Sequence, residues 1–216
     1  MRARLLWLLA IVSIVLGVGA AHAAALTREQ ALKALDHVDP ATRIEAIERL
    51  AVIGRMADAE TLMRRLGDDD EDVRDAATQA IWQVWSRSGD AAIDRLFARG
   101  IEHMQRQELD DALKVFDEIV RRKPAFAEGW NKRATVLFLL GEDERSLRDC
   151  DEVLKRNPHH FGALSGAAQI HLRLGHLEQA LEFFQRALKV NPNLDGIRQL
   201  IPLIEQRLRA RERSTT

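Results

Sequence analysis

The chain has 216 residues with 33 acidic and 32 basic side chains, so its formal net charge is −1. This balance provides no basic field that would gather phosphates, and we therefore expect no nucleic-acid partner. Apolar residues make up 46% and charged residues 30%, with only five prolines, which is typical of regular amphipathic helices and not of disordered or collagen-like chains.

The N-terminal segment has the three parts of a secretory signal. Arg2 and Arg4 precede an apolar run from Leu5 to Val18, and the small residues around Ala21-His22-Ala23 follow it. An uncleaved anchor is the alternative, but about 14 apolar residues are fewer than the roughly 20 that span a bilayer. We therefore expect removal of residues 1–23, which predicts secretion through the inner membrane, a periplasmic location and no membrane insertion of the mature chain.

Residues 24–88 carry a repeat with a period of 31 residues. The matching pairs are Asp39 with Asp70, Arg43 with Arg74, Ala46 with Ala77, Leu50 with Ile81 and Ile53 with Val84. Each unit is expected to form two antiparallel helices, because Asp39 is a good N-cap, Pro40 suits the first helical position, and Gly54 can close the helix in the left-handed conformation. This segment resembles HEAT repeats, whose helix pairs carry an aspartate before the helix and an arginine a few residues into it.

Two local patterns refine this region. Thr27 and Gln30 are placed as a capping box, which predicts a lone helix over residues 27–35 that covers the exposed end. The acidic run from Asp68 to Asp72 lacks the alternating ligands, internal glycine and closing glutamate of a calcium loop. We interpret it as the start of a helix, where the helix dipole favours acidic side chains.

A boundary follows at Ser88, Gly89 and Asp90, which interrupt the helical pattern. Trp82 and Trp85 stand just before it, three residues apart, so both rings point to nearly the same side of a helix. They form either an exposed platform for a ligand or the filling of a joint with the next region. The second interpretation is favoured, because large aromatic surfaces are costly to leave in water.

From residue 91 onward the period is 34 residues. The recurring positions are Leu96, Trp130 and Leu164; Gly100, Ala134 and Ala168; Ala112, Ser146 and Ala180; Phe116, Cys150 and Phe184; Pro124, Pro158 and Pro192. This pattern of a large residue, a small residue, alanine, an aromatic and a proline resembles tetratricopeptide repeats (TPRs). The resemblance implies three helix pairs, at residues 93–126, 127–160 and 161–194.

A capping helix is predicted over residues 195–211, followed by a short tail at 212–216, because Ile197, Leu200, Ile201, Ile204 and Leu208 form one apolar stripe. Pro202 lies inside it and predicts a kink or a helix that begins only near this residue. Together these elements predict an all-α fold, a right-handed α-solenoid of antiparallel helix pairs in which a HEAT-like segment precedes three TPR units and a capping helix.

Cys150 is the single cysteine, so the chain can form no internal disulfide. It occupies the repeat position of Phe116 and Phe184, which is apolar in the neighbouring units. We therefore expect a small, buried and unreactive core residue.

In TPR proteins the first helix of each pair lines a concave groove, and the resemblance implies a groove that binds a peptide or protein here. The positions that it assigns are Phe97, Ile101, Met104, Glu128, Asn131, Lys132, Thr135, Phe138, Ser165, Gln169, Leu172 and Arg173. The alternative is that this face packs against the preceding segment or the capping helix. Phe97 and Ile101 cannot donate to a carboxylate, so a free C-terminus is not the expected ligand.

Catalytic and metal-binding patterns fail on spacing. Gly162, Ser165 and Gly166 do not fit the Gly-x-Ser-x-Gly of a nucleophile elbow, and the adjacent His159 and His160 diverge and cannot chelate one ion from one helix face. The sequence also lacks a His-Glu-x-x-His segment and phosphate-binding glycine patterns. We therefore expect no enzyme activity, no metal and no cofactor.

The sequence as a whole predicts a non-catalytic scaffold or adaptor of the bacterial cell envelope that binds a protein or peptide partner. One alternative is a structural subunit that forms a homo-oligomer by filling its groove with another copy. The other is an accessory subunit that regulates an envelope enzyme.

Overall fold

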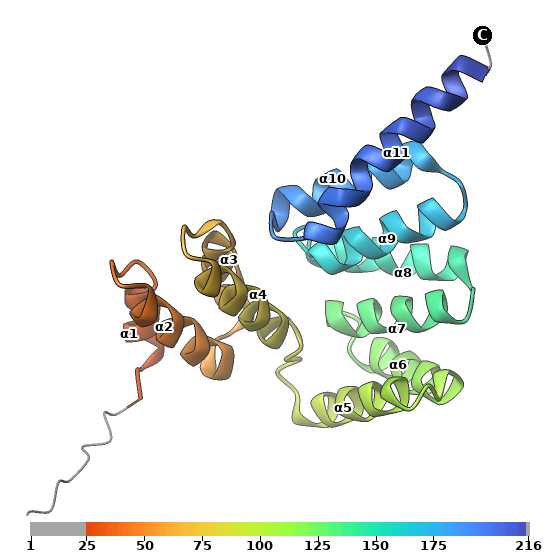
Figure 1. The fold of residues 1–216 in the computed structure, drawn as a ribbon. Helices are drawn as coiled ribbons and strands as arrows, with labels where there is room; N and C mark the ends of the chain where they lie inside the picture. Colours follow the sequence, from red (N-terminus) through yellow and green to blue (C-terminus); the bar gives the residue numbers. More distant parts are fainter. Residues whose placement is uncertain (1–24, 215–216) are drawn as a thin grey trace, which may run out of the picture.

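The computed structural model describes residues 25–214, which form helices and turns without a strand (Figure 1). The predicted signal segment lies outside the described residues. The elements in chain order are α1 (Arg28–Ala34), α2 (Pro40–Ile53), η1 (Met56–Asp58), α3 (Ala59–Arg64), η2 (Arg65–Gly67), α4 (Glu71–Trp85), α5 (Ala91–Gln105), α6 (Leu109–Arg122), α7 (Ala127–Leu139), α8 (Asp143–Arg156), α9 (Phe161–Arg173), α10 (Leu177–Val190) and α11 (Asp195–Ser214). The predicted all-α solenoid of antiparallel helix pairs is confirmed.

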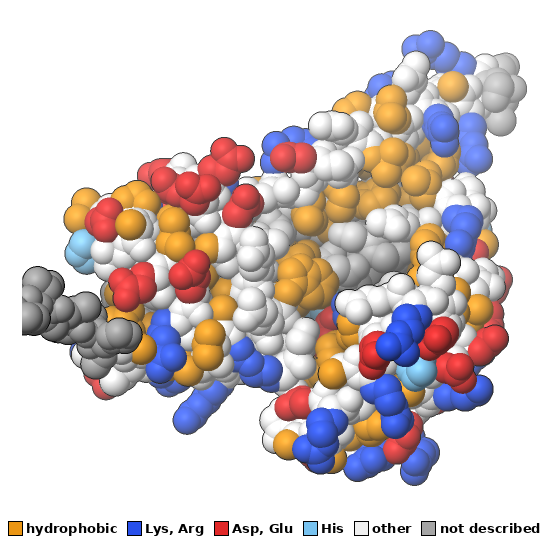
Figure 2. Space-filling model, turned by 60° about the horizontal axis from the view of Figure 1, so that its bottom comes forward, with side chains coloured by type: hydrophobic (Ala, Val, Ile, Leu, Met, Phe, Trp, Pro, Cys, Tyr) orange, Lys and Arg blue, Asp and Glu red, His pale blue; other side chains and the backbone are white. Residues whose placement is uncertain are grey.

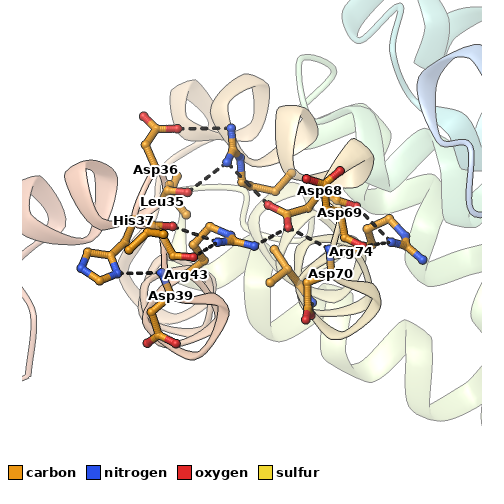
Figure 3. Close-up of polar contacts among 12 residues, drawn as sticks. Leu35, Asp36, His37, Asp39, Arg43, Asp68, Asp69, Asp70 and Arg74 are labelled. Carbon is orange, nitrogen blue, oxygen red and sulfur yellow. Dashed lines mark hydrogen bonds and ion pairs between the residues drawn. The ribbon is translucent and has the colours of Figure 1, made fainter.

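The repeat of 31 residues recurs in the contacts of α1–α4. Asp39 and Asp70 each cap the following helix by accepting from the backbone N–H three residues later, at 3.0 and 3.1 Å. Arg43 donates to the carbonyl oxygens of the two residues before Asp39, at 2.8 and 3.0 Å. Arg74 does the same with the two residues before Asp70, at 2.9 and 3.1 Å (Figure 3). The two turns are therefore closed by the same hydrogen bonds.

The acidic run takes part in this network rather than forming an open ligand set. Asp68 pairs with Arg43 at 2.6 Å (Figure 3), and Arg65 lies 3.6 Å from it. Burial acts to raise the pKa of Asp68, but the hydrogen bond from Arg43 lowers it below the usual range. Among residues 25–214 no cluster of three or more His, Cys, Asp or Glu side chains suits a metal ion.

The end of α2 differs from the prediction. Gly54 has φ −65° and ψ 158°, an extended conformation that any residue adopts, so the predicted left-handed conformation is wrong. Its N–H donates to the carbonyl oxygen of Leu50 at 2.7 Å, and a Cβ on Gly54 would lie 2.4 Å from that oxygen. Close approach of the backbone, and not a positive φ, requires glycine here.

The turns inside the TPR pairs do use left-handed residues, 34 positions apart. Gly141 and Gly175 have φ 80° and 77°, and Gln107 occupies the equivalent position with φ 60°. The small residue of the first unit is also required, because a Cβ on Gly100 would lie 2.6 Å from the Phe116 ring. The two helices of a pair therefore cross closely at the predicted point.

The α1–α4 segment lies beside the TPR stack and not at its end (Figure 1). Its apolar core includes Phe161 at the start of α9, with Val190 and Leu194 packed against it. Asn193 donates to the carbonyl oxygen of Leu66 at 2.8 Å. The core of α5 and α6 forms a separate cluster. The contacts of Phe161 and Asn193 therefore join the α1–α4 segment to the third TPR unit, across a long stretch of sequence.

The last helix, α11, covers the other end of the stack. Ile204 is buried with Leu177 and Phe184, and the rest of the predicted stripe packs around them. The helix begins at Asp195 and continues through the exposed Pro202, so the expectation that it begins only near this proline is wrong. No helix within the described part of the chain has the length and apolarity that crossing a bilayer requires.

Candidate functional site

A pocket of about 190 Å³ lies on the concave face between α7 and α9. Five of the twelve predicted groove residues line it: Asn131, Thr135, Phe138, Ser165 and Gln169. The remaining lining residues are Ala134, Ser146, Cys150, Gly162, Gly166 and Ile170. The hollow between α5 and α11 is visible in Figure 2. The structure thus brings five residues that the TPR register predicts, from two separate helices, to one pocket.

The polar groups of this pocket differ in the hydrogen bonds that they can form with a ligand. The Thr135 and Ser165 hydroxyls donate to backbone carbonyls one turn earlier, at 2.9 and 2.7 Å, so they offer a ligand their oxygen lone pairs. Gln169 is exposed, and its amide makes no hydrogen bond within residues 25–214. With the Phe138 ring beside it, this amide can pair with the backbone of an extended peptide.

The sequence-based reasoning did not include the small residues that open the pocket. Gly166 carries no side chain, and a Cβ there would lie 3.8 Å from the Cys150 sulfur, at ordinary contact distance. The TPR register assigns Ser165 to the groove, but it does not include Gly162 and Gly166, which lie on the same face of α9. Their spacing of three and four on one helix face is the signal that could have identified the pocket floor.

The predicted groove residues of α5 do not join this site. Phe97 is buried and packs edge-on against Phe116 and Phe126, with ring centroids 6.0 and 5.5 Å apart. Ile101 and Met104 pack against the same core cluster. These three residues pack within the first TPR unit and do not line this pocket.

Glu128 and Asn131 are also buried, and the packing alternative applies to them. Glu128 has 1% of its surface exposed, and three polar groups surround its carboxylate. Its oxygens lie 2.8 Å from His160 Nε2 and 3.1 Å from Lys132 Nζ, and Asn131 Nδ2 lies 3.2 and 3.1 Å from its two oxygens. Glu128 is therefore a structural anchor, while Asn131 contacts both this network and the pocket.

The protonation of this cluster follows from its hydrogen bonds. His160 Nδ1 accepts from the backbone N–H of Ala163 at 3.1 Å, so Nε2 carries the proton that is donated to Glu128. Burial acts to raise the pKa of Glu128, but the hydrogen bond from His160 and the charge of Lys132 together lower it. The carboxylate is held ionised inside the protein.

The two tryptophans fill the joint between the two regions, as predicted. The Trp85 ring stacks on His160 with centroids 4.4 Å apart, and Trp82 meets Phe161 edge-on at 5.1 Å. The Lys132 ammonium lies 5.4 Å from the Trp82 ring, so this predicted groove residue also faces the joint. An exposed aromatic platform is therefore wrong for Trp85, which is 2% exposed.

The far end of α9 is braced by charge. Arg173 Nε donates to Asp143 at 2.9 Å, and Nη2 donates to the carbonyl oxygen of Phe138 at 3.0 Å. Its guanidinium lies 3.8 Å from the Phe138 ring centroid. Leu172 packs with the cluster beneath α11. Both predicted residues therefore hold the pocket wall and do not line the pocket.

Comparisons with known proteins agree with this architecture. Tetratricopeptide repeat models match residues 97–153 and 161–194, and the second range coincides with the third predicted unit. A TPR repeat-containing protein of Rhizobium etli is 32% identical over 80 residues, which cover 37% of this chain and 39% of the relative. The chain thus spans about two fifths of that relative's length.

Solved structures share the fold at low identity. The first TPR of Spaghetti (RPAP3), bound to the HSP90 peptide SRMEEVD, is 22% identical with a TM-score of 0.52, over 54% of this chain and 92% of that one. The Sgt2 TPR domain of Aspergillus fumigatus gives 17% and 0.54, over 59% and 85%. MamA gives 17% and 0.53, over 74% and 88%. Residues 97–153 and 161–194 of this chain are therefore tetratricopeptide repeats within an α-solenoid.

Proposed function

We propose that this protein is a non-catalytic adaptor of the bacterial cell envelope that holds an extended peptide segment of a partner protein between α7 and α9. The observation that carries the proposal is the open pocket of about 190 Å³, which five predicted groove residues line. Its mixture of the Phe138 ring, hydroxyl oxygens and the Gln169 amide suits a peptide backbone with an apolar side chain. TPR structures of this fold include one that holds a peptide.

Panning a displayed library of random peptides against the mature chain tests the pocket. We expect selected peptides to lose at least about tenfold in affinity with Gln169→Trp, because the indole fills the space that a ligand side chain needs. Gln179→Trp is the matched control, since Gln179 is exposed on α10 outside this pocket. Equal losses in the two variants, or peptides that bind both as tightly as the parent, would contradict the pocket assignment.

The envelope location is supported by the order of charged, apolar and small residues before Ala24. Expression of the full chain in a Gram-negative host, followed by fractionation, should give a periplasmic protein whose first residue is Ala24. A cytoplasmic product that begins at residue 1 would contradict the location and leave the pocket proposal unaffected.

Self-assembly is the competing function, because a second copy could fill the same pocket. Light scattering distinguishes the two, and we expect the same monomer mass at all protein concentrations. A mass that rises with concentration, and falls back with Gln169→Trp, would favour the structural subunit over the adaptor. An accessory subunit of an envelope enzyme would use the same pocket and would be recognised by the activity of its partner.

A further inference from the structure

Two adjacent pockets separate α3 from the turns that join the TPR units. The larger, about 490 Å³, lies between α3, the turn before α9 and the last turn of α10. The second, about 420 Å³, continues to the turn before α7 and shares Glu60, Met63 and Pro158 with the first. Together they form a groove along α3, which we call the α3 groove. It is separate from the pocket between α7 and α9.

Cationic side chains surround the α3 groove. The larger pocket has Arg64, Arg186 and Lys189 in its lining, and the second has Arg87, Lys123 and Arg156. Glu60 is the single acid among the residues that line the two pockets. A chain with a net charge of −1 therefore presents a distinctly positive groove.

Two of the three cations of the larger pocket have no partner in the described part of the chain. Arg64 and Lys189 are exposed, and neither makes a side-chain hydrogen bond or ion pair within residues 25–214. They stand on opposite sides of the larger pocket, one on α3 and the other on α10. Their charges are available to an anionic ligand without breaking an existing contact.

The walls between the cations are apolar. Met63, Pro158, Leu164 and Val190 line the larger pocket. A ligand that fits must therefore carry apolar side chains as well as negative charge. Two pockets in a row favour an extended segment over a single small carboxylate, because a small ion would leave most of the groove empty.

The residues of this sequence outside 25–214 do not provide such a segment. Residues 1–24 and 215–216 contain no aspartate or glutamate. We infer that the α3 groove binds an extended acidic segment of a partner protein, whose carboxylates pair with Arg64 and Lys189 while apolar side chains enter the pockets. This is a second binding surface, which goes beyond the proposed function of the TPR pocket.

Fluorescence anisotropy with short labelled peptides tests this inference on the mature chain. We expect a peptide of alternating glutamate and leucine to bind, and peptides of alternating lysine and leucine or of glutamate and serine to bind at least about tenfold more weakly. Affinity for the first peptide should fall as NaCl rises from about 0.05 to about 0.5 M, because salt screens exposed charges. Equal binding of the lysine peptide, or no binding at low salt, would overturn the inference.

Charge reversal identifies the surface. Arg64→Glu with Lys189→Glu should weaken binding of the glutamate-leucine peptide at least about tenfold. Arg148→Glu with Arg207→Glu is the control of equal charge change, at two exposed sites outside both pockets. An equal loss of affinity in the control would show that the net charge, and not the α3 groove, governs binding. This result would overturn the inference. Circular dichroism verifies that both variants keep the helix content of the parent.

Other occupants give distinct outcomes. Binding of phosphatidylglycerol vesicles that depends on Arg64 and Lys189, without peptide binding, would replace the protein partner by a membrane surface. A dimer that the same double reversal dissociates would identify the occupant as a second copy of this chain. Gln169→Trp should leave binding at the α3 groove unchanged, so failure here and failure of the TPR pocket are distinguishable.

Discussion

At the residue scale, the main correction concerns Glu128, which the TPR register assigns to a groove and the structure buries. The register defines where a side chain lies on its helix, and this part is correct. What covers the helix is not defined by the register, and here Trp82, Trp85 and His160 cover the first turn of α7. A buried carboxylate is tolerated because Asn131, His160 and Lys132 surround it with three polar groups.

Replacing Glu128 by glutamine should destabilise the protein in a pH-dependent way. The folded-state pKa of Glu128 lies below its ordinary value of 4.5, so its contribution is fully present above that value and is lost as the pH falls through the folded pKa. We expect Glu128→Gln to lower the free energy of unfolding by about 2–4 kcal/mol at pH 7, and by less in acid.

Urea unfolding at pH 7 and below pH 4.5 measures this difference. Glu102→Gln is the control, because Glu102 forms an exposed pair with Arg106 and should matter little at either pH. A difference between parent and Glu128→Gln that is constant or grows in acid would contradict the buried carboxylate network.

Cys150 should be unreactive in the native protein, as the repeat register predicts. Burial, followed by the negative charge of Asp149, raises the pKa of its thiol to about 12. We expect negligible labelling by a disulfide reagent at neutral pH, and one thiol per chain after unfolding in urea. Rapid stoichiometric labelling of the folded chain would show that the thiol is accessible and ionised.

At the scale of elements, α9 is shared by three parts of the protein. Its first turn lies against the joint, its middle forms one wall of the pocket, and its last turn is braced by Asp143. Small residues at Gly162 and Gly166 make the first two contacts possible. Different side chains lie opposite the two glycines. Substitution by alanine should therefore have opposite effects on stability at the two positions.

Gly162→Ala should destabilise the protein by about 1–3 kcal/mol, because its Cβ would lie 2.4 Å from the Trp82 ring. That ring cannot turn aside easily, since His160, Trp85 and Phe161 surround it. Gly166→Ala should stabilise by about 0.5–1 kcal/mol, since alanine favours a helix and its Cβ finds ordinary contact distance. Thermal unfolding measures the stability of both variants. Unfolding temperatures that shift in the same direction would contradict the opposite effects expected at the two glycines.

At the scale of the whole molecule, two repeat arrays lie side by side and share one joint. In a solenoid each unit contacts its neighbours in sequence, so stability spreads from unit to unit. Here the chain reverses after α4, and the first array reaches the third TPR unit through Phe161 and Asn193. The joint therefore couples the α1–α4 segment directly to the second and third TPR units.

Removing the joint should uncouple the two arrays. In the mature chain with Trp82→Ala and Trp85→Ala, Trp130 is the remaining tryptophan, and it reports only on the TPR units. We expect its fluorescence and the far-ultraviolet circular dichroism to follow different urea transitions in this variant and one transition in the parent. A control with Trp82→Phe and Trp85→Phe should unfold in one transition, like the parent. Coincident transitions in the alanine variant would contradict the coupling.

Much of the local structure could be read from the sequence. The capping box of Thr27 and the caps of Asp39 and Asp70 were predictable because short-range chemistry sets helix starts. The crossing at Gly100 and the turns at Gly141 and Gly175 were predictable because the 34-residue register fixes them. The HEAT-like identity of residues 24–88 stays a prediction, although their repeat recurs in the contacts.

Periodicity alone determined the helix pairs, the TPR register and the side of each helix that faces its partner, because these depend on residues within about one repeat of each other. The tertiary structure decided which groove positions stay open, because a loop at residues 86–90 turns the first array onto the flank of the second. That contact joins residues about 80 positions apart, and no local spacing encodes it. It buries Glu128, leaves Thr135 and Gln169 exposed, and creates the cationic groove along α3.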